Sequence, residues 1–205
     1  ALSEKAEAYK NVPTMAFTHI QPAEITTIGY RLSQTLQDLL DDREQLVFVK
    51  KNIRGKGMKG AVGTAASYKE LVAESSVSSI ELENMVMEEL GIKAYDAATQ
   101  IYSRKQDLRI IEALSSIACT LHKFSLDFRI LQSPPIGEFS EPFGKMQVGS
   151  SAMPFKRNPI NSEKIDSLSR IVENAYQSAW NNAATTVLER SLDDSANRRI
   201  FIPES

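Results

Sequence analysis

The sequence predicts an all-α fold in which long helices pack side by side as a bundle, and three observations support this. Apolar residues recur three and four positions apart along four long stretches. Glycine or proline lies where three of these stretches begin or end. We find no persuasive run that alternates between apolar and polar residues, the pattern of a half-buried strand.

The first two helices are expected over residues 24–53 and 68–90. A helix over the first range would be about 45 Å long, a length typical of helical bundles. Gly91 follows the second range, at a position where a helix end favours a residue that tolerates the left-handed conformation. Long helices with apolar residues beyond one face also favour oligomerisation.

The third and fourth helices are expected over residues 103–132 and from Pro159 towards Leu188. Pro134 and Pro135 end the third, and Pro159 suits a first helical turn because its missing N–H has no helical partner there. Residues 136–158 between them are rich in Gly, Pro and Ser. A connection of this length without periodicity tends to be functional, so we expect the chemistry there.

Composition limits the class of protein. The 205 residues suffice for one domain, and the net charge of −2 gives no footprint for nucleic acid or an anionic membrane surface. No apolar run approaches the ~18 residues of a membrane span, and no signal segment opens the chain. A cytoplasmic protein is expected. The single cysteine, Cys119, lies among apolar residues and is expected to be a buried, inert thiol.

Both ends of the chain look cut. It begins at Ala1 inside what resembles the tail of a helix, and it stops shortly after Pro203 without a capping pattern. We therefore expect residues 1–205 to be the central helical-bundle segment of a longer protein, with N-terminal and C-terminal domains missing.

The run GSSAMPFKRNP, residues 149–159, places two hydroxyls, two cations and an amide before a helix, with Glu163 following. A serine hydroxyl is a poor base unless its alkoxide is stabilised, and Lys156 together with a helix N-terminus can supply that stabilisation. The alternative is a solvated linker in which Asn158 caps the helix.

The two histidines differ in their surroundings. His19 lies in FTHIQPA, just before the first expected helix, and histidine has a pKa suited to proton transfer near neutrality. A structural role is the alternative. His122 lies on the flank of the third helix and is expected to be a partly exposed helix residue without a catalytic role.

Two cationic stretches suit anions. Residues 54–64 contain the spacing G-x-G-x-x-G, but a helix rather than a strand precedes it, so we reject a dinucleotide site. The stretch ERSLDDSANRR, residues 189–199, offers guanidinium groups and a hydroxyl that suit a phosphate. The alternatives are a solvated charged helix face or metal binding by Asp193 and Asp194. No further carboxylate cluster or histidine supports a metal, so neither a metal nor a cofactor is expected.

The run at residues 149–159 resembles the GSSxMPxKxN signature of the fumarase/aspartase superfamily, and THxQPA resembles a second signature of that superfamily. The resemblance implies that Ser150 is the catalytic base and that Lys156 and Asn158 hold a substrate carboxylate. It also implies that Thr18 binds a carboxylate and that His19 is paired with Glu163.

Other stretches are similar to one branch, the adenylosuccinate lyases: KGAVGT, TQIYSRK and ERSLDDSANRR. By this resemblance Gln100 binds substrate, and the nucleotide is bound by Arg190, Ser195 and Arg199. Lys164 stands where the vertebrate-type enzymes carry arginine, so a bidentate fork is lost while the charge is kept.

The resemblance implies β-elimination of fumarate from adenylosuccinate, giving AMP, and from the succinyl-carboxamide ribotide of purine biosynthesis (SAICAR to AICAR). It further implies a homotetramer whose sites combine segments from three subunits, so the fragment alone is expected to be inactive. The alternatives are a sibling enzyme such as argininosuccinate lyase and, in another class, a non-catalytic helical scaffold.

Overall fold

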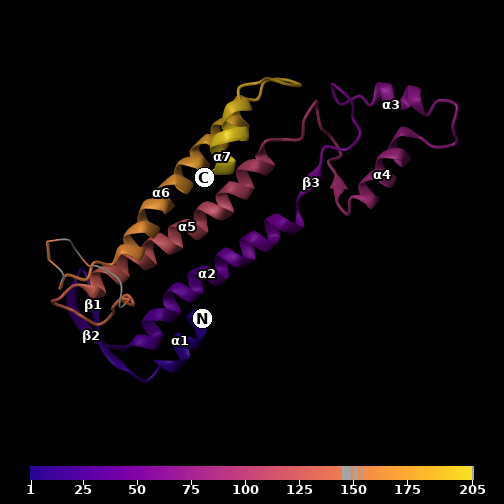
Figure 1. Cartoon of the computed structure of the whole chain (residues 1–205). Coiled ribbons are helices and arrows are strands. Elements are labelled where there is room, and N and C mark those ends of the chain that lie inside the picture. Colours follow the sequence, from indigo (N-terminus) through magenta and orange to yellow (C-terminus); the bar gives the residue numbers. More distant parts are fainter. Residues whose placement is uncertain (145–148, 150–151, 154, 205) are drawn as a thin grey trace. The chain divides into compact units, whose positions relative to one another are not determined.

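The computed structural model describes residues 1–144, 149, 152–153 and 155–204. This part of the chain is mostly helical, which confirms the predicted fold class (Figure 1). In chain order the elements are α1 (Leu2–Ala8), β1 (Pro13–Thr18), β2 (Gln21–Thr27), α2 (Ile28–Lys51), β3 (Arg54–Gly55), α3 (Ala66–Leu71), α4 (Ser79–Glu89), β4 (Lys93–Ala94), α5 (Lys105–Gln132), α6 (Ile160–Thr185), η1 (Asn197–Phe201) and α7 (Ile202–Glu204).

The chain divides into two compact units, each built from two segments of the sequence. Unit 1 contains residues 1–45 and 116–170, and unit 2 contains residues 46–115 and 171–205. Because both units use segments far apart in the sequence, each depends on long-range contacts for its stability.

Unit 1 contains a β-hairpin that was not expected from the sequence, and its second strand overlaps the start of the first expected helix. β1 and β2 pair antiparallel, with Thr18 opposite Gln21 and Pro13 opposite Thr27. The first long helix therefore begins at Ile28 rather than at residue 24. The expectation was wrong because Ile25 fits the helical spacing but belongs to a β-branched run, Ile-Thr-Thr, which favours a strand. Ile25 is 80% exposed and is not a core residue.

Polar contacts join α2 to α5 inside unit 1. The buried carboxylate of Asp42 accepts hydrogen bonds from Ser116 (2.5 Å) and Thr120 (2.7 Å). At the other end of α2, a Cβ added to Gly29 would collide with the backbone of Ala6 and Lys10. Glycine is therefore required where α1 crosses the start of α2.

The core of unit 2 lies between the first half of α5 and the second half of α6 (Figure 1). Leu108 and Ile111 pack against Ala175 and Ala179, which are each only 1% exposed. The small alanines allow the two helices to approach closely, and Ile202 of α7 covers this contact.

The second expected helix, over residues 68–90, is two helices in the structure. α3 ends at Leu71, and α4 begins at Ser79 after a serine-rich turn. The Ser75 hydroxyl bonds to the backbone of Val72 and Val77, which gives the chain an alternative to continued helix. Ser78 and Glu81 then form a capping box that starts α4.

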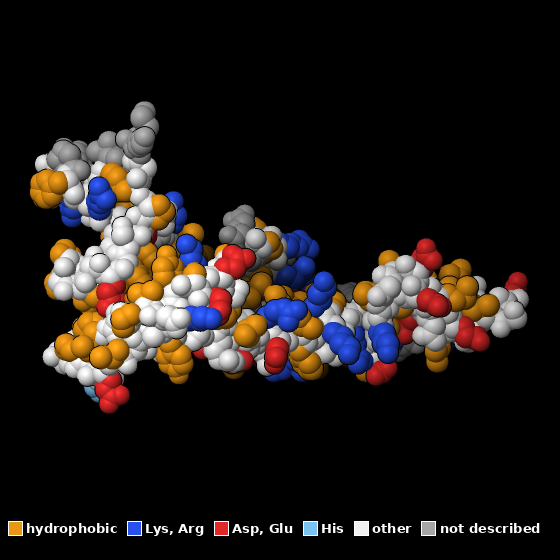
Figure 2. Space-filling model, turned by 90° about the horizontal axis from the view of Figure 1, so that it is seen from below, with side chains coloured by type: hydrophobic (Ala, Val, Ile, Leu, Met, Phe, Trp, Pro, Cys, Tyr) orange, Lys and Arg blue, Asp and Glu red, His pale blue; other side chains and the backbone are white. Residues whose placement is uncertain are grey.

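Many large apolar side chains of the long helices are exposed, as the predicted patterning implied (Figure 2). Leu114 and Leu121 of α5 and Trp180 of α6 are examples, at 42%, 39% and 50% exposure. Cys119 is also exposed, so the expectation of a buried thiol was wrong. His122 is partly exposed on α5, as predicted. In the part of the chain that the structure describes, no helix has both the length and the apolar character of a membrane span.

Candidate functional site

A groove of about 840 Å³ in unit 1 brings together residues from two of the predicted motifs. It lies between the end of α5, residues 155–159 and the start of α6, and Ile20 of the hairpin lines it as well. Lys156, Asn158 and Glu163 all line this groove. Because Ile20 follows His19 directly, the hairpin turn and the signature run meet at one place in unit 1.

The start of α6 is capped by a carboxylate from outside the helix. Glu141 accepts hydrogen bonds from the backbone N–H groups of Asn161 (3.1 Å) and Ser162 (2.8 Å) and from both of their side chains. Burial acts to raise the pKa of Glu141, but these hydrogen bonds outweigh it and hold the pKa below its usual range. Asn158 does not supply this cap.

The cap has a consequence for anion binding. The N-terminal donors and positive dipole end of α6 are already used by the Glu141 carboxylate. The sequence predicted that this helix end and Lys156 together stabilise a serine alkoxide. With the helix end occupied, that stabilisation rests on Lys156. Its side chain is exposed and forms no hydrogen bond or ion pair with any other described residue.

Glu163 faces an arginine at the edge of the groove. Its carboxylate lies 3.8 Å from Arg129, whose guanidinium also donates to the buried Asp166 at 2.6 Å. His19 and Glu163 are both described, and no hydrogen bond joins them within this single chain. The pairing that the resemblance implied is thus absent from the described part of one protomer.

The hairpin turn presents Thr18 and His19 to solvent. His19 and Ile20 have φ angles of 55° and 61°, so both lie in the left-handed region that non-glycine residues rarely adopt. Two successive positive φ values are those of a type I′ turn, which matches the twist of a two-residue hairpin. Glu138 holds the hairpin, because its carboxylate accepts from Thr14 and Arg31. Arg31 also donates to the carbonyl of Met15.

Two further predicted residues belong to this region. Lys164 lies on α6 and is exposed, one position after Glu163. Ser150, the predicted base, lies outside the described residues.

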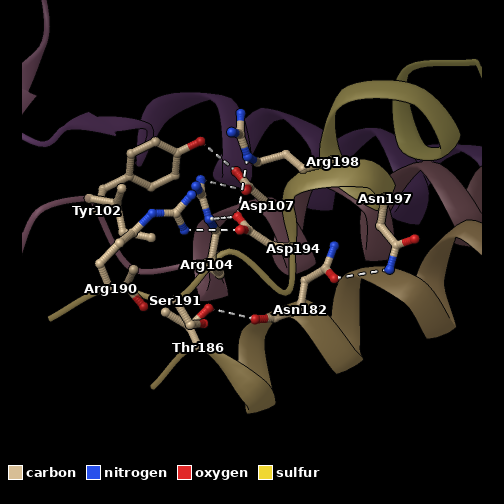
Figure 3. A network of polar contacts seen from close by, with 12 residues as sticks. Tyr102, Arg104, Asp107, Asn182, Thr186, Arg190, Ser191, Asp194, Asn197 and Arg198 are labelled. Carbon is tan, nitrogen blue, oxygen red and sulfur yellow. Dashed lines mark hydrogen bonds and ion pairs between the residues drawn. The ribbon is translucent and has the colours of Figure 1, made fainter. Parts of the chain in front are cut away.

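Unit 2 contains a separate cluster of charged residues around Asp194 (Figure 3). The Asp194 carboxylate is 1% exposed and lies 2.7 Å from Arg104 Nε, 2.9 Å from Arg190 Nη1 and 3.2 Å from Arg198 Nε. Burial acts to raise the pKa of Asp194, yet the Arg190 hydrogen bond and the three guanidinium charges hold it below its usual range. Arg190, a predicted nucleotide ligand, is therefore held by a residue of its own segment.

Arg104 extends this cluster to a second carboxylate. Its Nη1 donates to Asp107 at 3.3 Å, and the Tyr102 hydroxyl donates to the same carboxylate at 2.8 Å. Burial, together with the neighbouring Asp107, raises the pKa of Tyr102. Tyr102 and Arg104 both lie in the TQIYSRK stretch that the sequence analysis singled out.

The other predicted nucleotide-binding residues surround the same cluster. Gln100 donates its backbone N–H to Glu189 at 3.3 Å, which places it beside the segment that carries Arg190. Ser195 directly follows Asp194, and Arg199 is exposed in the π-helical turn η1. Unit 2 thus gathers Gln100, Arg190 and Ser195 in one region.

The glycine-rich stretch at residues 54–64 is held internally. Glu83 of α4 accepts from Lys59 at 2.7 and 2.9 Å and from the Met58 N–H at 2.8 Å. Lys56 donates to the carbonyl of Gly60 at 2.6 Å. Both lysines are engaged by the protein, so this loop offers little free positive charge to an anion.

Sequence reasoning missed the residues that position the predicted ones. Glu141 caps α6 from 20 positions away, Arg129 reaches Glu163 from α5, and Arg104 reaches Asp194 from 90 positions away. Asp194 and Arg104 both lie in quoted motifs, but nothing in their local spacing shows that they meet.

Comparisons with known proteins identify the family of the chain and several relatives. Residues 1–173 match the Lyase family. Adenylosuccinate lyase of Schistosoma mansoni is 44% identical over 206 aligned residues, and that of Schizosaccharomyces pombe is 40% identical over 205. Adenylosuccinate lyase of Pyrococcus horikoshii is 38% identical over 205 residues. In each case the whole chain is covered, but the chain spans only 42–44% of the relative's length.

Solved structures share the fold. A 3-carboxy-cis,cis-muconate lactonizing enzyme from Pseudomonas putida superposes with a TM-score of 0.84 at 23% identity, covering 99% of this chain and 43% of that one. A fumarate lyase from Mesorhizobium sp. BNC1 gives 0.80 at 21% identity, covering 99% and 42%. These likenesses concern the fold alone. The family match over residues 1–173 leads to one identification: this chain belongs to the Lyase family.

Proposed function

We propose that the chain is the central segment of a carbon–nitrogen lyase that releases fumarate from adenylosuccinate, giving AMP, and from SAICAR, giving AICAR. The observation that carries this proposal is 38–44% identity along the entire chain to proteins named adenylosuccinate lyase. The predicted catalytic and binding side chains are all present in the sequence.

The elimination begins with loss of a proton from carbon. Ser150 removes the proton next to a succinyl carboxylate, and negative charge develops on that carboxylate as the carbanion forms. Lys156 and Asn158 hold this charge, with Thr18 as a third ligand. The exposed ammonium of Lys156 in the groove supports this role, since a preorganised cation stabilises charge that develops in the transition state.

The carbon–nitrogen bond then breaks, and the departing purine-side nitrogen takes up a proton. We assign the donor role to His19, supported by Glu163. In one protomer Glu163 lies near Arg129 rather than His19. The proposed His19–Glu163 pair therefore requires residues of different subunits or a rearrangement on substrate binding.

The nucleotide end of the substrate is assigned to the charged cluster of unit 2. Arg190, Ser195 and Arg199 bind the phosphate-bearing part, and Gln100 contributes a side-chain amide. Arg190 supports this assignment because Asp194 occupies only one of its five donors. Lys164 is assigned a contact with the substrate through its positive charge. Its ammonium cannot form the bidentate hydrogen bonds of an arginine guanidinium.

The working enzyme is proposed to be a homotetramer with shared sites. The exposed leucines of α5 and Trp180 of α6 provide apolar surface for subunit contacts. The chain spans only 42% of the length of the Schistosoma mansoni relative, and we expect residues 1–205 alone to be inactive.

The decisive experiment uses the full-length protein with Ser150→Ala. We expect fumarate formation from adenylosuccinate to fall by about 10³-fold, the scale of a lost general base, while adenylosuccinate still binds. Near-normal turnover would remove Ser150 from the role. Ser151→Ala is the matched comparison, and loss of turnover in that variant alone would move the role to the neighbouring hydroxyl.

A sibling lyase acting on argininosuccinate is the second candidate. It shares the Ser150 and His19 signatures but has no need of the cationic cluster around Arg190. Parallel assays with adenylosuccinate and argininosuccinate separate the two. A helical scaffold without catalysis is the third candidate, and the absence of turnover with either substrate would favour it.

A further inference from the structure

The Asp194 carboxylate has several cationic partners, whereas a simple ion pair has one. Three guanidinium groups meet it, from Arg104, Arg190 and Arg198 (Figure 3). Asp194 and Arg104 are almost completely buried, with side chains 1% and 4% exposed. A buried charge is costly unless it is paired, so this pair fixes the centre of the cluster.

The remaining two arginines are held only in part. Arg190 uses Nη1 on Asp194 and stays 18% exposed, and Arg198 uses Nε and stays 32% exposed. The described residues give the other donors of Arg190 no partner. Asp194 therefore fixes one side of the Arg190 guanidinium and leaves its other N–H donors available to a ligand.

The charge balance of the cluster favours an anion. Three guanidinium groups face two carboxylates, those of Asp194 and Asp107, so one positive charge is left over. Without Asp194 the three arginines would repel one another, and Arg190 would lose its only described side-chain partner.

We infer that Asp194 is a positioning residue that holds Arg190 in the orientation needed to bind the substrate's phosphate, with the buried Arg104 fixing Asp194 in turn. This inference rests on the proposed function, because it takes Arg190 as a phosphate ligand. Asp194 itself does not touch the substrate, since its oxygens are occupied by arginines of the protein.

The test uses the full-length protein with Asp194→Asn, which keeps the size of the side chain and removes its charge. Steady-state turnover of adenylosuccinate is measured, together with product inhibition by AMP and by fumarate. We expect the KM for adenylosuccinate and the inhibition constant of AMP to rise about tenfold, the effect of one weakened charge-assisted hydrogen bond. The inhibition constant of fumarate, which carries no phosphate, should change less than about twofold, and kcat should change little.

Asp193→Asn is the matched control. Asp193 is the exposed neighbour in the same segment, and its substitution removes the same charge from the same sequence context. It should leave both inhibition constants at their wild-type values. This control separates a local positioning effect from a general change in the protein's electrostatic field.

The outcomes are distinct. If Asp194→Asn and Asp193→Asn behave alike, or if AMP and fumarate weaken together, the inference is overturned while the proposed function stands. A wild-type protein that does not cleave adenylosuccinate overturns both. If Asp194→Asn loses its helical circular dichroism, Asp194→Glu takes its place, and AMP alone should then bind about threefold more weakly because the carboxylate lies one methylene farther out. Unchanged AMP inhibition in a folded Asp194→Glu protein also overturns the inference.

Discussion

The groove of unit 1 and the Asp194 cluster of unit 2 present charged residues in opposite ways. In the groove, Lys156 is exposed and has no described ion-pair partner. In the cluster, Arg104 is buried and every arginine meets a carboxylate. A charged side chain left to solvent costs little stability and remains free for a ligand, whereas one buried with partners belongs to the framework. Substitutions in the two regions should therefore separate activity from stability.

Among the charged residues of the two regions, the largest effect is expected for Lys156→Met in the full-length protein. The proposed role of the ammonium is to hold charge that develops in the transition state, so kcat/KM should fall by about 10²–10³-fold. The free energy of unfolding should change by less than about 0.5 kcal/mol, because the side chain is exposed. Steady-state kinetics and urea unfolding measure the two quantities.

Lys123→Met is the control for the groove. Lys123 is an exposed lysine of α5 with a solvent-exposed partner, Asp127, at 3.5 Å. Its substitution should change neither quantity appreciably. A large loss of stability in Lys156→Met would contradict the distinction between the two regions.

Arg104→Gln should show the reverse pattern. Its removal leaves the buried Asp194 without its closest cation, and breaking a buried pair costs about 3 kcal/mol of unfolding free energy. Arg109→Gln is the matched control: Arg109 is an exposed arginine of α5, five positions after Arg104, and its substitution should stay within about 0.5 kcal/mol. Equal midpoints of the two variants in urea would show that the cluster does not stabilise unit 2.

The two regions also differ in how far the sequence predicted them. The third helix was predicted closely, because its apolar spacing is regular and because Pro134 and Pro135 lack the N–H groups needed to continue it. The run from Gly149 to Pro159 was assigned as a unit because its residues are contiguous. Local signals of this kind do not depend on which distant segments come into contact when the chain folds.

The failures share a physical cause. The hairpin was missed because Ile25 satisfies a helical spacing as well as a strand, and only pairing with β1 decides between them. The central role of Asp194 was missed because Arg104 lies 90 positions away, so the contact exists only in the folded chain. The His19–Glu163 pairing remains a prediction, since it depends on an assembly rather than on one protomer.

The smallest expected effect tests the comparison within unit 1, where the partly buried carboxylate of Glu141 has a structural role. Glu141→Gln should weaken the cap of α6 and lower the free energy of unfolding by about 1 kcal/mol near pH 7, a value that allows for partial exposure.

The pH dependence of this effect follows from the lowered pKa of Glu141. A carboxyl whose pKa is lower in the folded state contributes stability above its unfolded pKa, about 4.3 for glutamate, and loses that contribution as the pH falls through the folded value. The difference between wild type and Glu141→Gln should thus be constant from pH 7 to about 5 and shrink below about pH 4. Thermal unfolding across this range measures it, with the exposed Glu173→Gln of α6 as the control that shows no such trend. A difference that grows on acidification would mean that the uncharged carboxyl caps α6, and the groove would then have a positive helix end to offer its ligand after all.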